Sequence, residues 1–174
     1  SETPNFMLTM HPVVSRLEAE NYIKRLGRFG VKFDQVLEGL KLREQKGILP
    51  PRFVIRRVLD EMTGFIAKPA AENPLHTVFK TKLEKLEKVS PAVREKLLQA
   101  AEREITQTVY PAYQRLIAWF TALETKATDE DGAWKLPDGD AYYAECLRSN
   151  TTTSYSPEQV HQIGLQEVER IETE

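Results

Sequence analysis

The chain of 174 residues is long enough to bury one hydrophobic core, and its 41% apolar and 29% charged residues are typical of a globular protein. Its formal net charge of −2 comes from acidic and basic residues mixed along the whole length, which excludes the basic stripe of a nucleic-acid-binding protein. No apolar run reaches the ~20 residues of a membrane span, and the single cysteine, Cys146, excludes an internal disulfide.

Apolar residues recur at spacings of three and four along most of the chain, which predicts helices and no strands. The first helix is expected to begin at Ser15, whose hydroxyl can cap the N–H of Glu18 in a capping box. Gly27 and Gly30 are expected to interrupt the pattern before a second helix, which ends at Gly47. Pro50-Pro51 opens a third helix. A wide apolar band predicts a central position for it (Phe53, Val54, Val58, Leu59, Met62, Phe65 and Ile66).

The middle of the chain predicts a fourth helix over residues 75–86, followed by the longest helical stretch. Ser90-Pro91 begins that stretch, which is expected to end near Ala127. Pro111 lies inside it and removes one backbone hydrogen bond, so we predict a kink or a helix restart near Tyr110.

The last third of the chain begins with residues 128–140, the longest segment without a helical pattern. A short helix over Ala141–Arg148 and a polar loop over residues 150–154 are expected to follow. Ser156 and Gln159 predict a second capping box for the last helix. The buried stripe of that helix is expected to comprise Val160, Ile163, Gly164, Val168 and Ile171.

The last helix carries no glycine, proline or basic residue over Glu172-Thr173-Glu174, and natural helices favour cations at that end. This pattern predicts a helix that continues into further sequence. We therefore expect residues 1–174 to form a single all-α domain, the N-terminal fragment of a longer protein. Its predicted architecture is an irregular bundle of about seven helices, one of them long and proline-kinked.

Residues with catalytic or metal-binding potential are scattered. The three histidines are far apart in sequence, and no His-Glu-x-x-His motif occurs. The acidic run at residues 129–131 does not match a calcium loop, and the lysines between residues 80 and 88 alternate with glutamates, so both are interpreted as solvated surface. We expect no catalytic residue, metal ligand or cofactor in this chain.

One region has the composition of a binding site. Aromatic residues surround the turn at residues 137–139, and an arginine and several hydroxyls precede the N-terminus of the last helix, where a carboxylate or phosphate can be bound. The alternative is that the aromatic residues are core and the threonines are capping and turn residues. His161 is interpreted as structural or solvated beside Glu158, or as a further substrate contact. The candidate substrate-binding residues are Tyr142, Tyr143, Arg148, Thr151, Thr152, Thr153 and His161.

The same segments carry a family resemblance. The motifs are Leu136-Pro137-x-Gly139-x-x-Tyr142-Tyr143, Leu147-Arg148 with Thr151-Thr152-Thr153, and Ser156-Pro157-Glu158-Gln159-Val160-His161-x-x-Gly164. Upstream matches include Tyr22-x-x-Arg25-Leu26, Gly47-x-x-x-Pro51-Arg52 and Tyr110-Pro111-Ala112-Tyr113. In these motifs, which cover nearly the whole chain, the sequence resembles the bacterial domain-of-unknown-function 885 family.

The resemblance implies a longer, mostly helical protein that is similar to zinc metallopeptidases of the gluzincin type. The family's metal motif, a His-Glu segment followed by Pro-Gly-His-His, lies downstream of the matched region, so no metal ligand is carried over onto this chain. Zinc is expected only in the full-length protein. Some members carry lipoprotein signals, which leaves the periplasm or cell envelope and the cytoplasm both open as the compartment.

Two functions follow as hypotheses. In the first, this chain forms one wall of the substrate cleft of a zinc-dependent peptidase and contacts a peptide substrate and the remainder of its own polypeptide. It is not catalytic by itself. In the second, it is a non-catalytic helical interaction or scaffold module. If it is a fragment, its last helix is expected to expose apolar residues through which the chain self-associates.

Overall fold

A long helical spine runs through the molecule, composed of α6 (Pro91–Glu104), the π-helix η3 (Ile105–Val109) and α7 (Tyr110–Glu124). The computed structural model describes residues 2–173; Glu174, the last residue of the expected unfinished helix end, lies outside them. The other elements are α1 (Glu2–Asn5), η1 (Phe6–Met10), α2 (Arg16–Leu26), α3 (Phe29–Gln45), α4 (Arg52–Ile66), η2 (Ala70–Glu72), α5 (Pro74–Glu84), η4 (Ala133–Lys135), α8 (Gly139–Thr151) and α9 (Pro157–Thr173).

The predicted all-α fold is confirmed, since residues 2–173 form helices, turns and loops and no strand. When the spine is counted once, the described chain has seven helices of eleven residues or more. Among these described helices, none combines the length and the apolar composition that a bilayer crossing requires.

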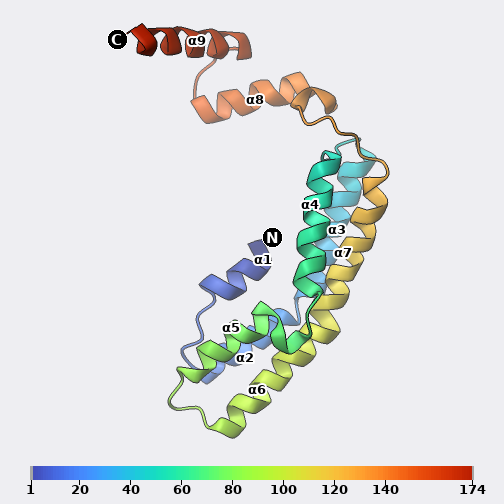
Figure 1. The fold of residues 1–174 in the computed structure, drawn as a ribbon, viewed down its shortest axis with the longest axis vertical. Coiled ribbons are helices and arrows are strands. Elements are labelled where there is room, and N and C mark those ends of the chain that lie inside the picture. Colours follow the sequence, from blue (N-terminus) through green and yellow to red (C-terminus); the bar gives the residue numbers. More distant parts are fainter. Residues whose placement is uncertain (1, 174) are drawn as a thin grey trace.

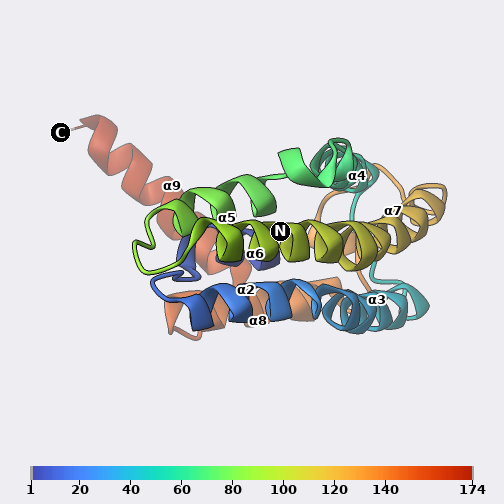
Figure 2. The same cartoon turned by 90° about the horizontal axis from the view of Figure 1, so that it is seen from below.

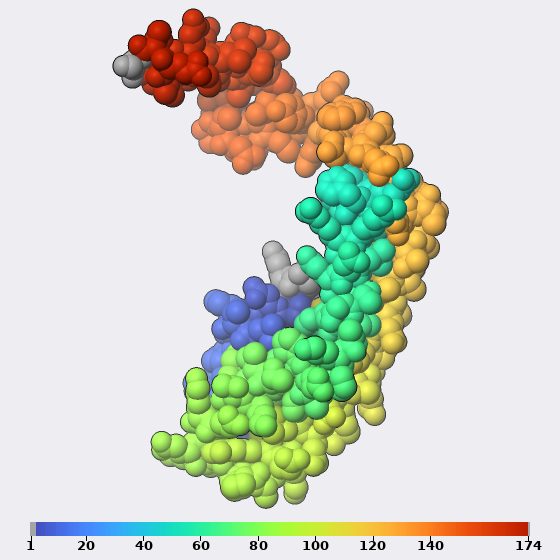
Figure 3. Space-filling model, in the orientation of Figure 1, coloured from blue at the N-terminus to red at the C-terminus, as the bar shows by residue number. Residues whose placement is uncertain are grey.

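The helices form two three-helix groups that share the spine. In one group α2 and α5 pack on α6, and in the other α3 and α4 pack on α7. Figure 1 and Figure 2 show α2 and α3 along one side of the spine and α5 and α4 along the other. Figure 3 shows that the molecule is curved, with α8 and α9 extending from one end. We call the side enclosed by α1, α4 and α8 the inner side.

The core follows the spine and includes an aromatic contact between α2 and α5. The Tyr22 ring stacks on Phe79 with 4.4 Å between ring centroids, and its hydroxyl donates a 2.8 Å hydrogen bond to the carbonyl of Leu75. Both rings are fully buried. A stacked pair with its polar group satisfied stabilises the joint between these helices beyond simple area burial.

The predicted helix ends at Ser15 and Gly47 are confirmed. Ser15 accepts from the N–H of Glu18 at 3.3 Å, although the Glu18 carboxylate accepts from Val14 N rather than from the cap residue itself. Gly47 has a φ of 70°, and the N–H of Ile48 donates to Arg43 O at 2.9 Å. These bonds form a Schellman motif, which satisfies the last carbonyls of α3.

The predicted disturbance at Tyr110 takes the form of η3. This wide π-turn ends at Val109, two residues before Pro111, and the N–H of Tyr110 bonds to the carbonyl of Ile105, five residues earlier. Because proline lacks the N–H and its ring crowds the preceding turn, the wider turn allows the helix to continue. The spine therefore curves without breaking (Figure 1).

Three expectations about burial and helix length were wrong. The helix α4 is not central, because it packs mainly on α7 and buries only Ile55 and Met62, while Phe53 is 45% exposed. Gly30 does not interrupt a helix but lies within α3. The helix α8 continues to Thr151, so Asn150 and Thr151 are helical rather than part of a loop.

The expected buried stripe of α9 is also wrong. No residue of α9 is buried, and Ile163, Val168 and Ile171 are 42–62% exposed. The physical reason is placement: α9 projects from α8 away from the two helix groups (Figure 3), so its apolar face meets no core among the described residues.

Candidate functional site

A sharp turn sets the start of α8 and thereby places its tyrosines. Asp138 adopts a left-handed conformation with a φ of 54°, which aspartate tolerates better than most residues. A Cβ atom at Gly139 would lie 2.1 Å from the carbonyl oxygen of Ala133. Only glycine therefore allows η4 to pack this closely on α8, and the N–H of Tyr142 then bonds to Asp138 O at 2.9 Å.

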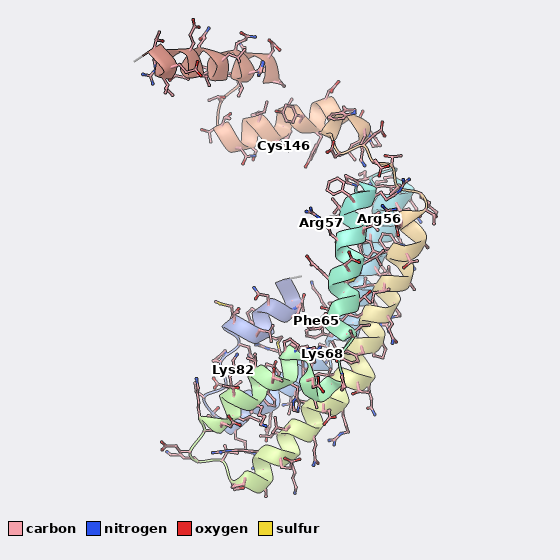
Figure 4. All side chains as sticks on the ribbon, in the orientation of Figure 1. Arg56, Arg57, Phe65, Lys68, Lys82 and Cys146 are labelled. Carbon is pink, nitrogen blue, oxygen red and sulfur yellow. The ribbon has the colours of Figure 1, made fainter. Side chains whose placement is uncertain are left out.

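Tyr142 borders a pocket of about 490 Å³ between the ends of α3, α7 and α8. Its walls are mostly apolar and include Leu49, Trp119, Phe120 and Leu136. The Tyr142 side chain is 56% exposed, and its hydrogen bond with the Cys146 thiol raises the pKa of Tyr142. Cys146 is half-buried on α8 (Figure 4). The pocket is suited to an apolar or aromatic group.

Arg148 and the threonines lie together at the C-terminal end of α8. The Arg148 guanidinium forms a bidentate ion pair with Glu145, with distances of 2.9 and 2.7 Å. Thr151 donates to Leu147 O at 2.8 Å and lies 2.8 Å from the hydroxyl of Thr153. Thr152, with a φ of 56°, donates to Thr151 O at 2.7 Å. The threonine hydroxyls bond to helix carbonyls or to one another, and Glu145 offsets the charge that Arg148 offers to an anion.

His161 lies exposed on α9. Glu158, its expected neighbour on the same face, accepts a 3.0 Å hydrogen bond from Gln162 instead. The capping box of α9 is complete, because Gln159 N donates to Ser156 Oγ at 3.2 Å and Ser156 N donates to Gln159 Oε1 at 2.8 Å. The sequence therefore predicted the start of α9 correctly.

The candidate residues fall into separate groups. Tyr142 and Arg148 are six positions apart on α8, a rotation of about 240°, so they lie on different faces of the helix. The structure thus brings Arg148 and the three threonines together, but it places Tyr142 at the pocket and His161 on another helix. Sequence reasoning missed the remaining pocket walls, although Pro50-Pro51 and Trp119 mark two of them.

The inner side carries a further aromatic and cationic pair. On α4 the Arg57 guanidinium lies 6.0 Å from the centroid of the Phe53 ring. Figure 4 shows Arg57 directed toward the inner side, whereas the neighbouring Arg56 turns to Glu124 of α7 at 2.7 Å. An exposed cation over an aromatic face is a surface that can contact polar or aromatic groups of a ligand.

The described residues do not fit a zinc ion. Nowhere in residues 2–173 do three His, Cys, Asp or Glu side chains lie close enough together to hold a metal. Structural and catalytic zinc sites require at least three such protein ligands.

The sequence of residues 1–174 matches, over its whole length, the family described as bacterial proteins of unknown function (DUF885). The chain belongs to the DUF885 family. The family resemblance drawn from the motifs of α8 and α9 is thus confirmed, and the family description assigns no activity.

A solved structure supports the fold of this DUF885 chain. It is described as the crystal structure of the putative lipoprotein from Colwellia psychrerythraea, and it matches with a TM-score of 0.92 and 31% sequence identity. The match covers 97% of the present chain and 29% of the other chain, so this DUF885 chain spans less than a third of that protein's length. No curated protein matches the chain.

Proposed function

We propose that this chain forms one wall of a substrate cleft in a longer DUF885 protein and is not catalytic by itself. The observation that carries the proposal is the uncovered aromatic and apolar surface of α8 and α9. Tyr142, Tyr143 and Val168 are each 49–56% exposed on elements that border or extend beyond the inner side. Exposed apolar surface of this kind marks a site of interaction. The further length of the Colwellia protein supplies polypeptide that can form the opposite wall.

The substrate that we propose is a peptide. The pocket beside Tyr142 accepts an apolar side chain, and Tyr143, the following residue on α8, adds an exposed ring. Arg148 offers the guanidinium N–H groups that do not bond to Glu145 to a carbonyl or carboxylate group. The hydroxyls of Thr151–Thr153 would exchange their present hydrogen bonds for ones to the substrate, and His161 extends this surface onto α9. We assign to these contacts the binding and orientation of the peptide, and no catalytic role.

The chemistry of the full-length protein is proposed to be zinc-dependent peptide hydrolysis. Its support is the likeness of the DUF885 family to zinc metallopeptidases of the gluzincin type, which the family resemblance implies. In such an enzyme the chemistry that zinc would supply is that of a Lewis acid for the scissile carbonyl and for water. Because the described residues do not fit the metal, its ligands are assigned to the rest of the polypeptide. An envelope location is proposed with it, on the ground that the similar structure is described as that of a lipoprotein.

The test uses the full-length protein and a set of peptide substrates, with and without a metal chelator. Tyr142→Ala, Tyr143→Ala and Arg148→Gln are expected to raise KM by about tenfold while kcat is largely retained, because uniform binding contacts are lost. Arg103→Gln, which removes an exposed arginine from α6, is the matched control. Hydrolysis that persists in the presence of the chelator would exclude the zinc-dependent mechanism. An unchanged KM in all three variants would exclude the proposal that this chain forms a wall of the substrate cleft.

A second candidate is a non-catalytic interaction or scaffold module. The observation that favours it is the continuous core along the spine, from Tyr22 to Leu116, which is built entirely from this chain. A domain with its own core can be stable without the rest of a polypeptide. A full-length protein that hydrolyses none of the peptides, while this chain folds cooperatively alone, would favour the module.

A further inference from the structure

A second pocket lies between η1 and the corner where α2 passes into α3. It has a volume of about 440 Å³, which is within the range of small-molecule sites. Its apolar part is formed by Phe6, Met7 and Phe29, and its polar part by Arg25, Arg28 and Lys32. No candidate residue of the proposed cleft wall takes part in it.

The spacing of the cationic residues along the sequence places their side chains at this pocket. The three cationic residues are separated by three and four positions, which places them on one side of the nearly continuous α2–α3 corner. Met7 and Phe29 are each 2% exposed and form a fixed floor, while Phe6 is 47% exposed at the edge. Lys82 on α5 donates to the carbonyls of Met7 and His11 at 3.3 and 2.8 Å, so η1 is tied to the bundle.

No acidic side chain among those that the structure describes pairs with the cations of the pocket. None of the described lining residues is acidic, and the side chains of Arg28 and Lys32 form no hydrogen bond or ion pair with the described residues. Nearby carboxylates are used elsewhere: Asp34 pairs with Arg115 at 2.8 Å, and Glu104 accepts from Thr108 at 2.9 Å. Like charges grouped over an apolar floor repel one another, and a bound anion would relieve that repulsion.

Arg25 is held in position before any ligand arrives. Its Nη1 donates to His11 Nδ1 at 2.8 Å, and its guanidinium lies 5.5 Å from the centroid of the Phe6 ring. The other ring nitrogen of His11, Nε2, lies 3.3 Å from the carbonyl of Glu18. His11 therefore carries its proton on Nε2 and accepts on Nδ1. The remaining N–H groups of Arg25 are free to bind a carboxylate in the fork geometry of guanidinium.

We propose that this pocket binds an amphipathic carboxylate. Its carboxylate lies among Arg25, Arg28 and Lys32, and its apolar group lies on the floor of Phe6, Met7 and Phe29. Two sources share this chemistry: the C-terminus of a peptide with an apolar last residue, and a fatty acid. Inorganic phosphate lacks the apolar group that the floor requires. The proposal is independent of the cleft wall on α8 and α9.

Titration calorimetry on the whole chain tests the proposal. The probes are N-acetyl-leucyl-phenylalanine as the free acid and as its C-terminal amide, decanoate and decanol, and inorganic phosphate. The two free acids are expected to bind at least about tenfold more tightly than their uncharged counterparts, because charge-assisted hydrogen bonds are lost in the latter. Tighter binding of the peptide acid or of decanoate identifies the source, and either result supports the shared chemistry.

The variant R28Q/K32Q is expected to weaken binding of the free acids by at least about tenfold. K80Q/K96Q removes the same charge from exposed positions on α5 and α6 and is expected to bind as the wild type does. Circular dichroism checks the fold, and added salt is expected to weaken wild-type binding without any substitution. Equal binding of acid and amide, an unaffected R28Q/K32Q variant, or phosphate binding as tight as that of the acids would each overturn the proposal.

Discussion

Asn73 is completely buried between α4 and α5 and satisfies backbone groups of both. Its Nδ2 donates to the carbonyl of Phe65 at 2.7 Å, near the end of α4. Its Oδ1 accepts from the N–H of Leu75 at 3.0 Å and caps α5. Because helix ends leave backbone groups without partners, this one side chain replaces water at two of them.

Asn73→Ala is expected to lower the free energy of unfolding by about 2–4 kcal/mol, since it leaves a buried carbonyl and a buried N–H unpaired and removes a helix cap. Urea denaturation measures the loss. Thr81→Ala is the control, because Thr81 is exposed and bonds only to the carbonyl of Thr77. A loss for Asn73→Ala no larger than that of the control would contradict the assignment.

His11 makes the fold sensitive to pH. Burial, followed by the nearby Arg25 and Lys82 charges, lowers the pKa of His11 below its ordinary value of 6.5, and the Glu18 carbonyl and carboxylate oppose the shift only in part. The unfolded chain therefore binds the proton more readily than the folded chain does. The stability contributed by neutral His11 is fully present above the unfolded pKa and is lost as the pH falls below it.

The Tm of the wild type is accordingly expected to fall between about pH 7.5 and about pH 5.5, and His11→Gln is expected to reduce the size of that fall. Comparing the two slopes removes any effect of the substitution that does not depend on pH. His161→Gln, which replaces the exposed histidine of α9, should keep the wild-type slope. Parallel curves for wild type and His11→Gln would refute the role of His11.

The burial and the partners of single side chains could be predicted from the sequence only in part. The sequence treats the three histidines alike, whereas the structure buries His11 and His76 and exposes His161. Burial depends on which distant elements come to lie beside a residue, such as α5 beside η1, and no local pattern encodes that. The partner of Arg148 was missed although it is local, since the Glu145 pair follows the i, i+3 spacing that links side chains on a helix.

At the scale of elements, two glycines of α3 illustrate opposite roles. Gly47 ends the helix with a φ of 70°, in the left-handed region. Gly39 lies inside the helix, and a Cβ there would meet nothing within 4 Å. The first glycine is therefore needed for its conformation, whereas the second only adds flexibility to the unfolded chain.

Gly47→Ala is expected to lower the free energy of unfolding by about 1–2 kcal/mol, the cost of a left-handed conformation with a side chain. Gly39→Ala is expected to raise it by about 0.5–1 kcal/mol, because alanine restricts the unfolded chain and favours helix. Thermal and urea unfolding of both variants provides the comparison. Shifts of the same sign would mean that the termination of α3 does not depend on Gly47.

Element ends could be predicted from sequence because their causes are local. Ser15, Gly47 and the Ser156–Gln159 box each act within a few residues, and all three proved correct. The faces of helices could not be predicted in the same way. An apolar stripe on α4 or α9 shows that burial of that helix face is favourable. It does not show whether another element of this chain covers the face. The candidate site shares this limit, because Tyr142 and Arg148 lie close in sequence but on different faces.

At the scale of the whole molecule, the curved spine leaves α9 beyond the two helix groups (Figure 3). Its side chains at Ile163, Val168 and Ile171 recur at helical spacing and are 42–62% exposed. Water contact at such a stripe is unfavourable by roughly 25 cal/mol for each Å² of apolar surface. The stripe therefore favours contact with another surface. We propose that this surface is the remainder of the polypeptide in the full-length protein, and a second copy when the chain is alone.

The isolated chain is thus expected to self-associate, with a weight-average mass that rises with concentration in sedimentation experiments. I163D/V168D places two charges on the stripe and is expected to raise the dissociation constant by at least about tenfold, because charged groups oppose burial. Q162D/Q166D adds the same charge to the opposite face of α9 and should associate as the wild type does. A wild-type chain that stays monomeric at every concentration would show that the stripe has no affinity for a second copy. That result would favour the self-contained module over the cleft wall of a larger protein.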